Sequence, residues 1–259
     1  MMTSVRRLGV ILAHELRVAR RDPLPILVLV VFPIITMAFL KPAFRPALAQ
    51  AGHTGANGAE QVVPGQAVIS AFFVVSLMSI AFFSEHSANT WDRLRASQAA
   101  SLEIVLGKAL PRIAMSIAQF VVIFAAGVWL FDLNIRGDAM ALVPLVVAIA
   151  LCLAMLGVAV TAVFRTVQQA QAFAIVGMVL FGAIGGALVP FDVLPGWARA
   201  TAPVTPTYWA MKGFESVILD GEGLGGVAAP IGALMGMAAL FLLVALRRFR
   251  FEERKVGWV

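Results

Sequence analysis

The chain has 259 residues, of which 61% are hydrophobic and only 13% are charged, and its mean hydropathy is +0.92. Soluble domains are roughly 45–50% apolar, so this composition excludes an ordinary water-soluble domain and predicts an integral membrane protein. The net charge of +6 does not indicate nucleic-acid binding, because Lys and Arg collect on the cytoplasmic side of polytopic membrane proteins.

The first predicted element is an amphipathic helix over residues 5–21. Its apolar residues recur at helical spacing, namely Val5, Leu8, Ile11, Leu12, Leu16 and Ala19, while its arginines point elsewhere. Such a helix lies in the membrane interface with its arginines at the lipid headgroups. The alternative is that these arginines only anchor the topology of the first span. The following stretch, RRDPLP, turns the chain into the bilayer, since proline ends a helix.

Six apolar stretches are long enough to cross a bilayer core, which takes roughly 20 residues. They cover residues 24–40, 64–84, 112–131, 140–163, 171–190 and 228–246. The first is longer than the apolar region of a signal peptide, so we expect no cleaved leader. The fold class predicted is an all-α polytopic membrane protein with a single transmembrane domain and a tail at 247–259.

The distribution of positive charge predicts the orientation. Six spans place both chain ends on one side, together with residues 85–111. Most of the 20 Lys and Arg residues then lie on that side, and the opposite side holds Lys41, Arg45, Arg136, Arg199 and Lys212. The positive-inside rule therefore places both termini in the cytoplasm.

Ionisable side chains are missing from the cores of the predicted spans, where they usually mark proton relays or ion sites. An ion-driven transporter is therefore disfavoured. The sequence also lacks a G-x-x-x-x-G-K-[ST] phosphate loop and the H-E-x-x-H and G-x-S-x-G motifs. His14, His53 and His86 are spread over two membrane faces, and the single cysteine, Cys152, lies in an apolar run. We expect no metal site and no catalytic centre, so a transporter of this composition needs a motor on another polypeptide.

A charged stretch, EHSANTWDRLRASQAASLEIVLGKALP, interrupts the apolar sequence at 85–111. Thr90 can cap a helix and Asp92 favours its N-terminal dipole. Trp91 and Leu94 then share an apolar face edged by arginines. These features predict a short cytoplasmic amphipathic helix, although a solvated loop would also explain the charges.

Small and polar residues within the spans suggest contacts. Gly182 with Gly186, and Gly232 with Gly236, form G-x-x-x-G patterns, which are typical of close helix packing within the chain or at a dimer seam. The candidates for lining a pathway are Ser70, Ser76, Ser79, Ser116, Gln119 and Thr161, unless they bond neighbouring helices. So few polar groups favour an amphiphilic cargo over a hydroxylated sugar.

Four segments, taken in order, resemble the permease subunits of ABC exporters of the second type, the ABC-2 family. They are ELRVARRDPLPILVLVVFPIITMAFL at 15–40, VPGQAVISAFF at 63–73, TWDRLRASQAASLEIVLGKALP at 90–111 and GALVPFDVLPGWARATAPVTPTYWAMKGFESVILDG at 186–221. The resemblance covers nearly the whole chain. None of the segments is a catalytic fingerprint, and their order and spacing carry the likeness.

The resemblance implies roles for individual segments. It implies a connecting helix with Arg6, Arg7, Leu12, Leu16, Arg17, Arg20 and Arg21. It implies a coupling helix at about 89–100, with Glu85, Asn89, Thr90, Trp91, Asp92, Arg93, Leu94, Arg95 and Ser97. Short re-entrant outer helices would occupy 191–227. The sequence departs from the family pattern at Asn89, where glycine is usual, and at Gln98, where proline is usual.

The resemblance also implies partners and a location. Two ATP-binding subunits would hold ATP and Mg²⁺, with no cofactor in this chain, and a second permease chain would complete a homo- or heterodimer. The assembly would lie in the cytoplasmic membrane of a prokaryote and export a drug-like or lipid-like substrate. The alternatives are export of a polysaccharide or lipid-linked glycan, and a non-transporting anchor for a soluble partner.

Overall fold

The computed structural model describes residues 24–87 and 101–248, and within these ranges the chain forms helices and no strands. The helices are α2 (Leu24–Gln50), α3 (Ala59–Ala71), α4 (Phe73–Ser87), α6 (Ser101–Phe131), α7 (Leu142–Val163), α8 (Val167–Ile184), α9 (Gly196–Thr201), α10 (Pro206–Ile218) and α11 (Leu224–Arg248). Three short 3₁₀ helices occupy Ala139–Ala141, Phe191–Val193 and Ala202–Val204.

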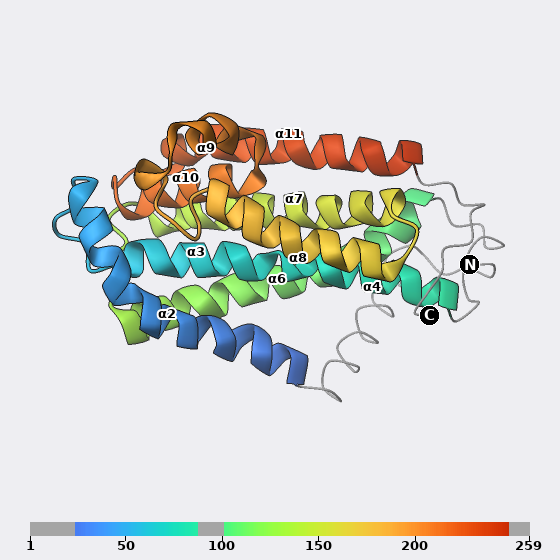
Figure 1. Cartoon of the computed structure of the whole chain (residues 1–259), viewed down its shortest axis with the longest axis horizontal. Helices are drawn as coiled ribbons and strands as arrows, with labels where there is room; N and C mark the ends of the chain where they lie inside the picture. The colour runs from blue at the N-terminus through green and yellow to red at the C-terminus, as the bar shows by residue number, and fades with distance from the viewer. Residues whose placement is uncertain (1–23, 88–100, 249–259) are drawn as a thin grey trace.

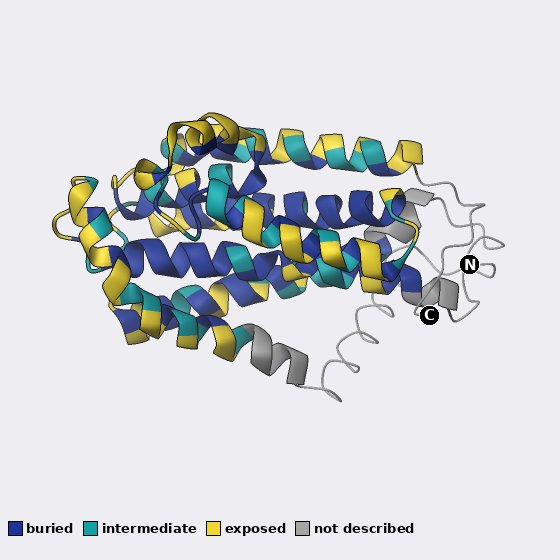
Figure 2. Ribbon diagram, viewed as in Figure 1, coloured by how far each residue is buried: buried dark blue, intermediate teal, exposed yellow. Residues whose placement is uncertain are grey.

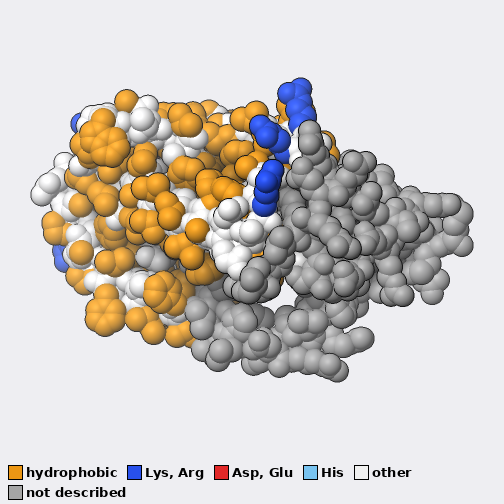
Figure 3. Space-filling model, turned by 45° about the vertical axis from the view of Figure 1, so that its right-hand side comes forward, with side chains coloured by type: hydrophobic (Ala, Val, Ile, Leu, Met, Phe, Trp, Pro, Cys, Tyr) orange, Lys and Arg blue, Asp and Glu red, His pale blue; other side chains and the backbone are white. Residues whose placement is uncertain are grey.

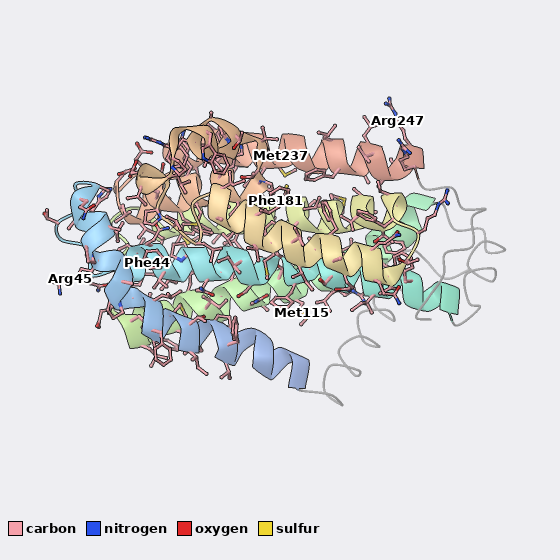
Figure 4. The ribbon with its side chains drawn as sticks, viewed as in Figure 1. Phe44, Arg45, Met115, Phe181, Met237 and Arg247 are labelled. Atoms are coloured by element: carbon pink, nitrogen blue, oxygen red, sulfur yellow. The ribbon has the colours of Figure 1, made fainter. Side chains whose placement is uncertain are left out.

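The long helices run side by side along the long axis of the molecule (Figure 1). α3 and α4 follow one another along nearly one line, with a break at Phe72. The last residues of α4 and α11 and the first residues of α6 lie at the side of the bundle marked by Arg247 (Figure 4). α2 ends, and α3 begins, at the opposite end, marked by Arg45. We call these the Arg247 end and the Arg45 end.

α3 and α7 form the centre of the bundle and are buried along most of their length (Figure 2). α7 packs against α11, α4 and α6. Gly157 permits the contact with α4, since a Cβ added there would lie 2.8 Å from the Cβ of Met78 and 3.1 Å from the Cα of Val75. Small residues allow such close backbone approach between helices in membranes.

The outer helices present apolar side chains on their free faces. Large exposed hydrophobic residues include Phe32, Phe39, Val121, Ile175 and Leu240, and hydrophobic side chains cover most of the described surface in Figure 3. A surface this apolar would drive aggregation in water. Within the described ranges, six helical stretches have the length and apolarity of membrane spans, at Val30–Gln50, Ala59–Phe83, Gly107–Phe131, Ala139–Val163, Val167–Ile184 and Leu224–Arg248. The all-α class and the six spans predicted from the sequence are therefore confirmed.

The first span extends further than predicted. The apolar run ends at residue 40, but α2 continues through Lys41, Pro42 and Pro46 to Gln50. The Lys41 ammonium donates a hydrogen bond to the carbonyl of Phe131 at 2.6 Å and lies 3.8 Å from the Asp132 carboxylate. The charge therefore meets the carbonyl end of α6, where the helix dipole favours a cation.

The fifth span ends earlier than the predicted boundary at 190. α8 stops at Ile184 because Gly186 adopts φ +89°, a left-handed conformation that glycine tolerates best. The N–H groups of Ala187 and Leu188 both donate to the carbonyl of Gly182, at 2.9 and 3.0 Å. This arrangement satisfies a carbonyl at the helix end, as in other glycine-terminated helices.

The segment between the fifth and sixth spans folds into short helices. Thr205 caps α10, since its hydroxyl accepts from the N–H of Tyr208 at 3.2 Å, and Pro206 occupies the first turn, where its missing N–H costs nothing. Phe214, fully buried, anchors α10 against α6 through ring contacts with Phe120 and Phe124 at 6.1 and 5.2 Å.

Candidate functional site

The predicted coupling helix at about 89–100 lies outside the described residues, as does the predicted connecting helix at 5–21. Glu85 belongs to α4, but its side chain is outside the description as well. The structure does show where the coupling segment is attached. α4 ends at Ser87 and α6 begins at Ser101, both at the Arg247 end, so the segment joins two bundle helices directly.

Four of the pathway candidates, Ser76, Ser116, Gln119 and Thr161, occupy three helices of the bundle. Ser116 and Gln119 are buried on α6, and the Ser116 hydroxyl has no hydrogen-bond partner among the described residues. The Thr161 hydroxyl on α7 donates to the carbonyl of Gly157 at 2.8 Å, inside its own helix. Ser76 on α4 is partly buried, and its carbonyl accepts from the Gln171 amide at 3.2 Å. A role for these residues in a pathway stays a prediction.

The two glycine pairs differ from the predicted pattern. Gly182 is buried in α8, but Gly186 follows the end of that helix, so the two do not share a helix face and this part of the prediction is wrong. Gly232 and Gly236 both lie on α11, and a Cβ added at either would meet nothing within 4 Å. They therefore make no close helix contact within the described chain, and a seam with a second chain stays a prediction.

A pocket of about 250 Å³ opens at the Arg45 end, between α3, the end of α8 and α10. Its polar lining comprises His53, Glu60, Gln61, Asp192, Tyr208, Lys212 and Glu215. Leu48, Pro64 and Phe191 contribute apolar surface. None of the predicted pathway residues lines this pocket.

The deepest polar groups of the pocket belong to the first turn of α3. Glu60 is 5% exposed and Gln61 is 7% exposed. One Glu60 carboxylate oxygen, Oε2, accepts from the N–H groups of Asn57 and Gly58 at 3.0 and 3.2 Å, whereas Oε1 has no hydrogen bond to any described residue. The Gln61 amide donates from Nε2 to the carbonyl of Gly186 at 2.7 Å, which leaves its own carbonyl oxygen free to accept.

Glu215 faces the same pocket from α10, and its carboxylate forms no ion pair or hydrogen bond with a described residue. Burial, followed by the negative charges of Asp192 and Asp220, raises the pKa of Glu215 from 4.5 to about 7, against an opposing effect of Lys212. The Lys212 ammonium instead lies over the rings of Tyr208 and Trp209, at 5.8 and 5.6 Å from their centres. The pocket thus contains carboxylate oxygens that the protein leaves without a partner.

Sequence reasoning missed this pocket. Its key residues are separated by more than a hundred positions, and only the folded bundle brings α3 and α10 together. The available signal is a carboxylate, Glu215, within the amphipathic sequence of α10. The described residues contain no group of three or more His, Cys, Asp or Glu placed to hold a metal ion.

The comparison with known families decides the class of the protein. The family model described as ABC-2 type transporter matches residues 6–219, which include α2 to α10 and the segment that joins α4 to α6. This chain belongs to the ABC-2 transporter family. The resemblance found in the sequence is confirmed, and the chain is a membrane-spanning member of this family.

Curated relatives agree with this assignment. The chain is 25% identical over 181 residues to the linearmycin resistance permease protein LnrN of Bacillus subtilis, covering 69% of this chain and 47% of that protein. It is 25% identical over 146 residues to the probable multidrug ABC transporter permease YbhR of Escherichia coli K12, covering 56% and 40%. ABC transporter G family member 20 of Dictyostelium discoideum is 23% identical over 206 residues, covering 78% and 28%. The chain thus spans less than half the length of each of these relatives.

Proposed function

We propose that this chain is the permease of an ATP-driven exporter that moves an amphiphilic, drug-like or lipid-like substrate out of the cytoplasm or the inner leaflet. The observation that carries the proposal is the family match over residues 6–219. Because the sequence has no phosphate-binding loop, ATP and Mg²⁺ would bind on separate subunits. Two such subunits and a second permease chain would complete the transporter.

The proposed orientation places the Arg247 end in the cytoplasm of a prokaryote. Residues 88–100 and 249–259 are joined to helix ends at this end of the bundle, and together with residues 1–23 they contain many of the arginines that the sequence analysis assigned to the cytoplasm. The Arg45 end would then face outward, and α9 and α10 would enter the outer leaflet. Trp197 of α9, 67% exposed, suits such an interface.

The proposed coupling follows from the attachment of residues 88–100 to α4 and α6. Closure of the ATP-binding subunits would move this segment, and the two helices would carry the movement into the bundle. To shift a two-state permease from 1:99 to 99:1, the motor must supply about 5.5 kcal/mol of differential binding free energy. An apolar contact through Trp91 and Leu94, edged by arginines, is suited to transmit that load.

The test is a double substitution, Trp91→Ala with Leu94→Ala, in the chain co-expressed with its ATP-binding subunit. We expect loss of ATP-dependent substrate flux in membrane vesicles with unchanged membrane insertion, because the change lies outside the spans. Trp129→Ala is a matched control, since Trp129 is 82% exposed at the other end of α6 and should retain flux. Normal flux in the double variant would refute the coupling role.

The substrate class is supported by two observations. The relatives are named for linearmycin resistance and for multidrug transport, and the bundle offers few polar side chains for a hydroxylated cargo. Vesicles should therefore export an amphiphilic drug but no lipid-linked glycan. Glycan flux without drug flux would replace the proposed substrate, and absence of any ATP-dependent flux would favour a membrane anchor.

A further inference from the structure

The pocket at the Arg45 end has the composition of a binding site, although the predicted pathway residues lie elsewhere. Its volume of about 250 Å³ is just below the roughly 300 Å³ at which pockets for drug-sized ligands begin. A small molecule, or the headgroup of a larger one, would therefore fit. The capacity of this pocket to bind a ligand belongs to the isolated chain and does not depend on the proposed exporter function.

The free hydrogen-bonding atoms of Glu60, Gln61 and Glu215 accept, and the Lys212 ammonium is an exposed donor in the same lining. Glu60 Oε1 and the Gln61 carbonyl belong to side chains that are more than nine-tenths buried, and neither atom has a hydrogen-bond partner among the described residues. The carboxylate of Glu215 adds further acceptor oxygens. Neither atom of Glu60 or Gln61 is fully enclosed, so these acceptors are open to a ligand that brings several hydrogen-bond donors.

The charge of the pocket selects a cation. Glu60, Asp192 and Glu215 line it, against one exposed ammonium, that of Lys212. The rings of Phe191 and Tyr208 lie 5.2 Å apart in the same wall and can contact both an apolar group and a positive charge. A divalent metal does not fit, because the described residues provide no cluster of metal-binding side chains.

We propose that this pocket binds a ligand with a primary ammonium group next to a short apolar portion. A primary ammonium carries three N–H donors and no acceptor, which matches the three acceptor side chains Glu60, Gln61 and Glu215. The aromatic wall and Leu48 take the apolar portion. Charge-assisted hydrogen bonds of this kind are roughly twice as strong as neutral ones.

The probe for the test is 2-phenylethylamine, compared with its neutral isostere 2-phenylethanol. Calorimetric titration of the purified full-length chain in mild detergent at pH 8 should detect binding of the amine. The alcohol should bind at least about tenfold more weakly. Glu215→Gln should weaken amine binding by at least about tenfold. Glu222→Gln is the matched control, because Glu222 is an exposed carboxylate near the same end that does not line the pocket.

The pH dependence of binding provides a readout that a purely structural role of Glu215 would not give. The charged groups around it are Asp192, Lys212 and Asp220, with Glu60 and His53 across the pocket. Because the pKa of Glu215 is raised to about 7, its carboxylate is neutralised as the pH falls from 8 to 6. Amine affinity should fall with it, and this dependence should flatten in Glu215→Gln.

His53 also lines the pocket, so His53→Gln tests whether the pH dependence needs this side chain. If Glu215 is the source, His53→Gln keeps the loss of affinity at pH 6. Equal affinity for the amine and the alcohol, undiminished amine binding by a folded Glu215→Gln variant, or no amine binding by the unmodified chain would each overturn the proposal.

Discussion

The substitution Glu215→Gln should make the protein more stable at alkaline pH and leave its stability nearly unchanged in acid. Glu215 faces the pocket without a partner, and its folded-state pKa of about 7 exceeds its ordinary value of 4.5. The folded chain therefore holds this proton more tightly than the unfolded chain. The resulting stabilisation is fully present below pH 4.5 and is lost as the pH rises through about 7.

The size of this change in stability follows from the size of the pKa shift of Glu215. The rise in pKa from 4.5 to about 7 corresponds to at most about 3.5 kcal/mol, since one pKa unit is worth about 1.4 kcal/mol. Because Glu215 is only partly buried, solvent screening reduces this to about 1–2 kcal/mol. For a chain of this length, 1 kcal/mol shifts Tm by about 2–4 °C, so Glu215→Gln should raise Tm at pH 8 by about 2–8 °C.

The assay is thermal unfolding of the purified chain in detergent, followed from pH 5 to pH 8 for the unmodified protein, Glu215→Gln and Glu222→Gln. The Tm of Glu215→Gln should match the unmodified protein near pH 5 and exceed it at pH 8. A difference that is constant over this range, or one equally large for Glu222→Gln, would refute the reasoning. A more stable variant that no longer binds the amine would show that the unpaired carboxylate serves binding rather than folding.

Two further substitutions test the packing of the bundle. Gly157→Ala should destabilise the chain by about 1–3 kcal/mol, because the added methyl overlaps Met78. As a control, Gly232→Ala should leave Tm unchanged or slightly higher, since a Cβ there meets nothing within 4 Å. Equal Tm values for the two variants would contradict the described contact between α4 and α7. Lys41→Met keeps the length of the side chain but loses the charged hydrogen bond to the carbonyl of Phe131. The free energy of unfolding should fall by about 1.5–3 kcal/mol, which a lower Tm would report. An unchanged Tm would show that this bond contributes nothing.

The sequence predicts the spans because lipid imposes a strict length and apolarity on a membrane helix. Their ends are harder to predict, since they depend on partners in other helices. Lys41 was placed beyond the first span, but the carbonyl end of α6 accepts its charge and α2 continues. For the same reason Gly186 was assigned to a helix by its spacing, whereas its left-handed backbone ends α8.

The functional regions divide in a similar way. A cap and an apolar face around Trp91 and Leu94 predict a short amphipathic helix, and the family resemblance implies its coupling role; both remain predictions because these residues lie outside the description. The pocket could not be predicted, since Glu60 and Glu215 meet only through the packing of α3 with α10. Neither carboxylate belongs to a catalytic motif, and the unpaired Oε1 of Glu60 and carboxylate of Glu215 are properties of the folded chain.

The most direct test of the proposed function is to purify the full-length chain from its native membrane in mild detergent and to identify the co-purifying proteins by mass spectrometry. A stoichiometric soluble ATPase that is lost from the Trp91→Ala, Leu94→Ala variant is the predicted result, because residues 88–100 are proposed to bind it. A chain that purifies alone, or with a protein that has no nucleotide-binding fold, would contradict the proposal of an ATP-driven permease.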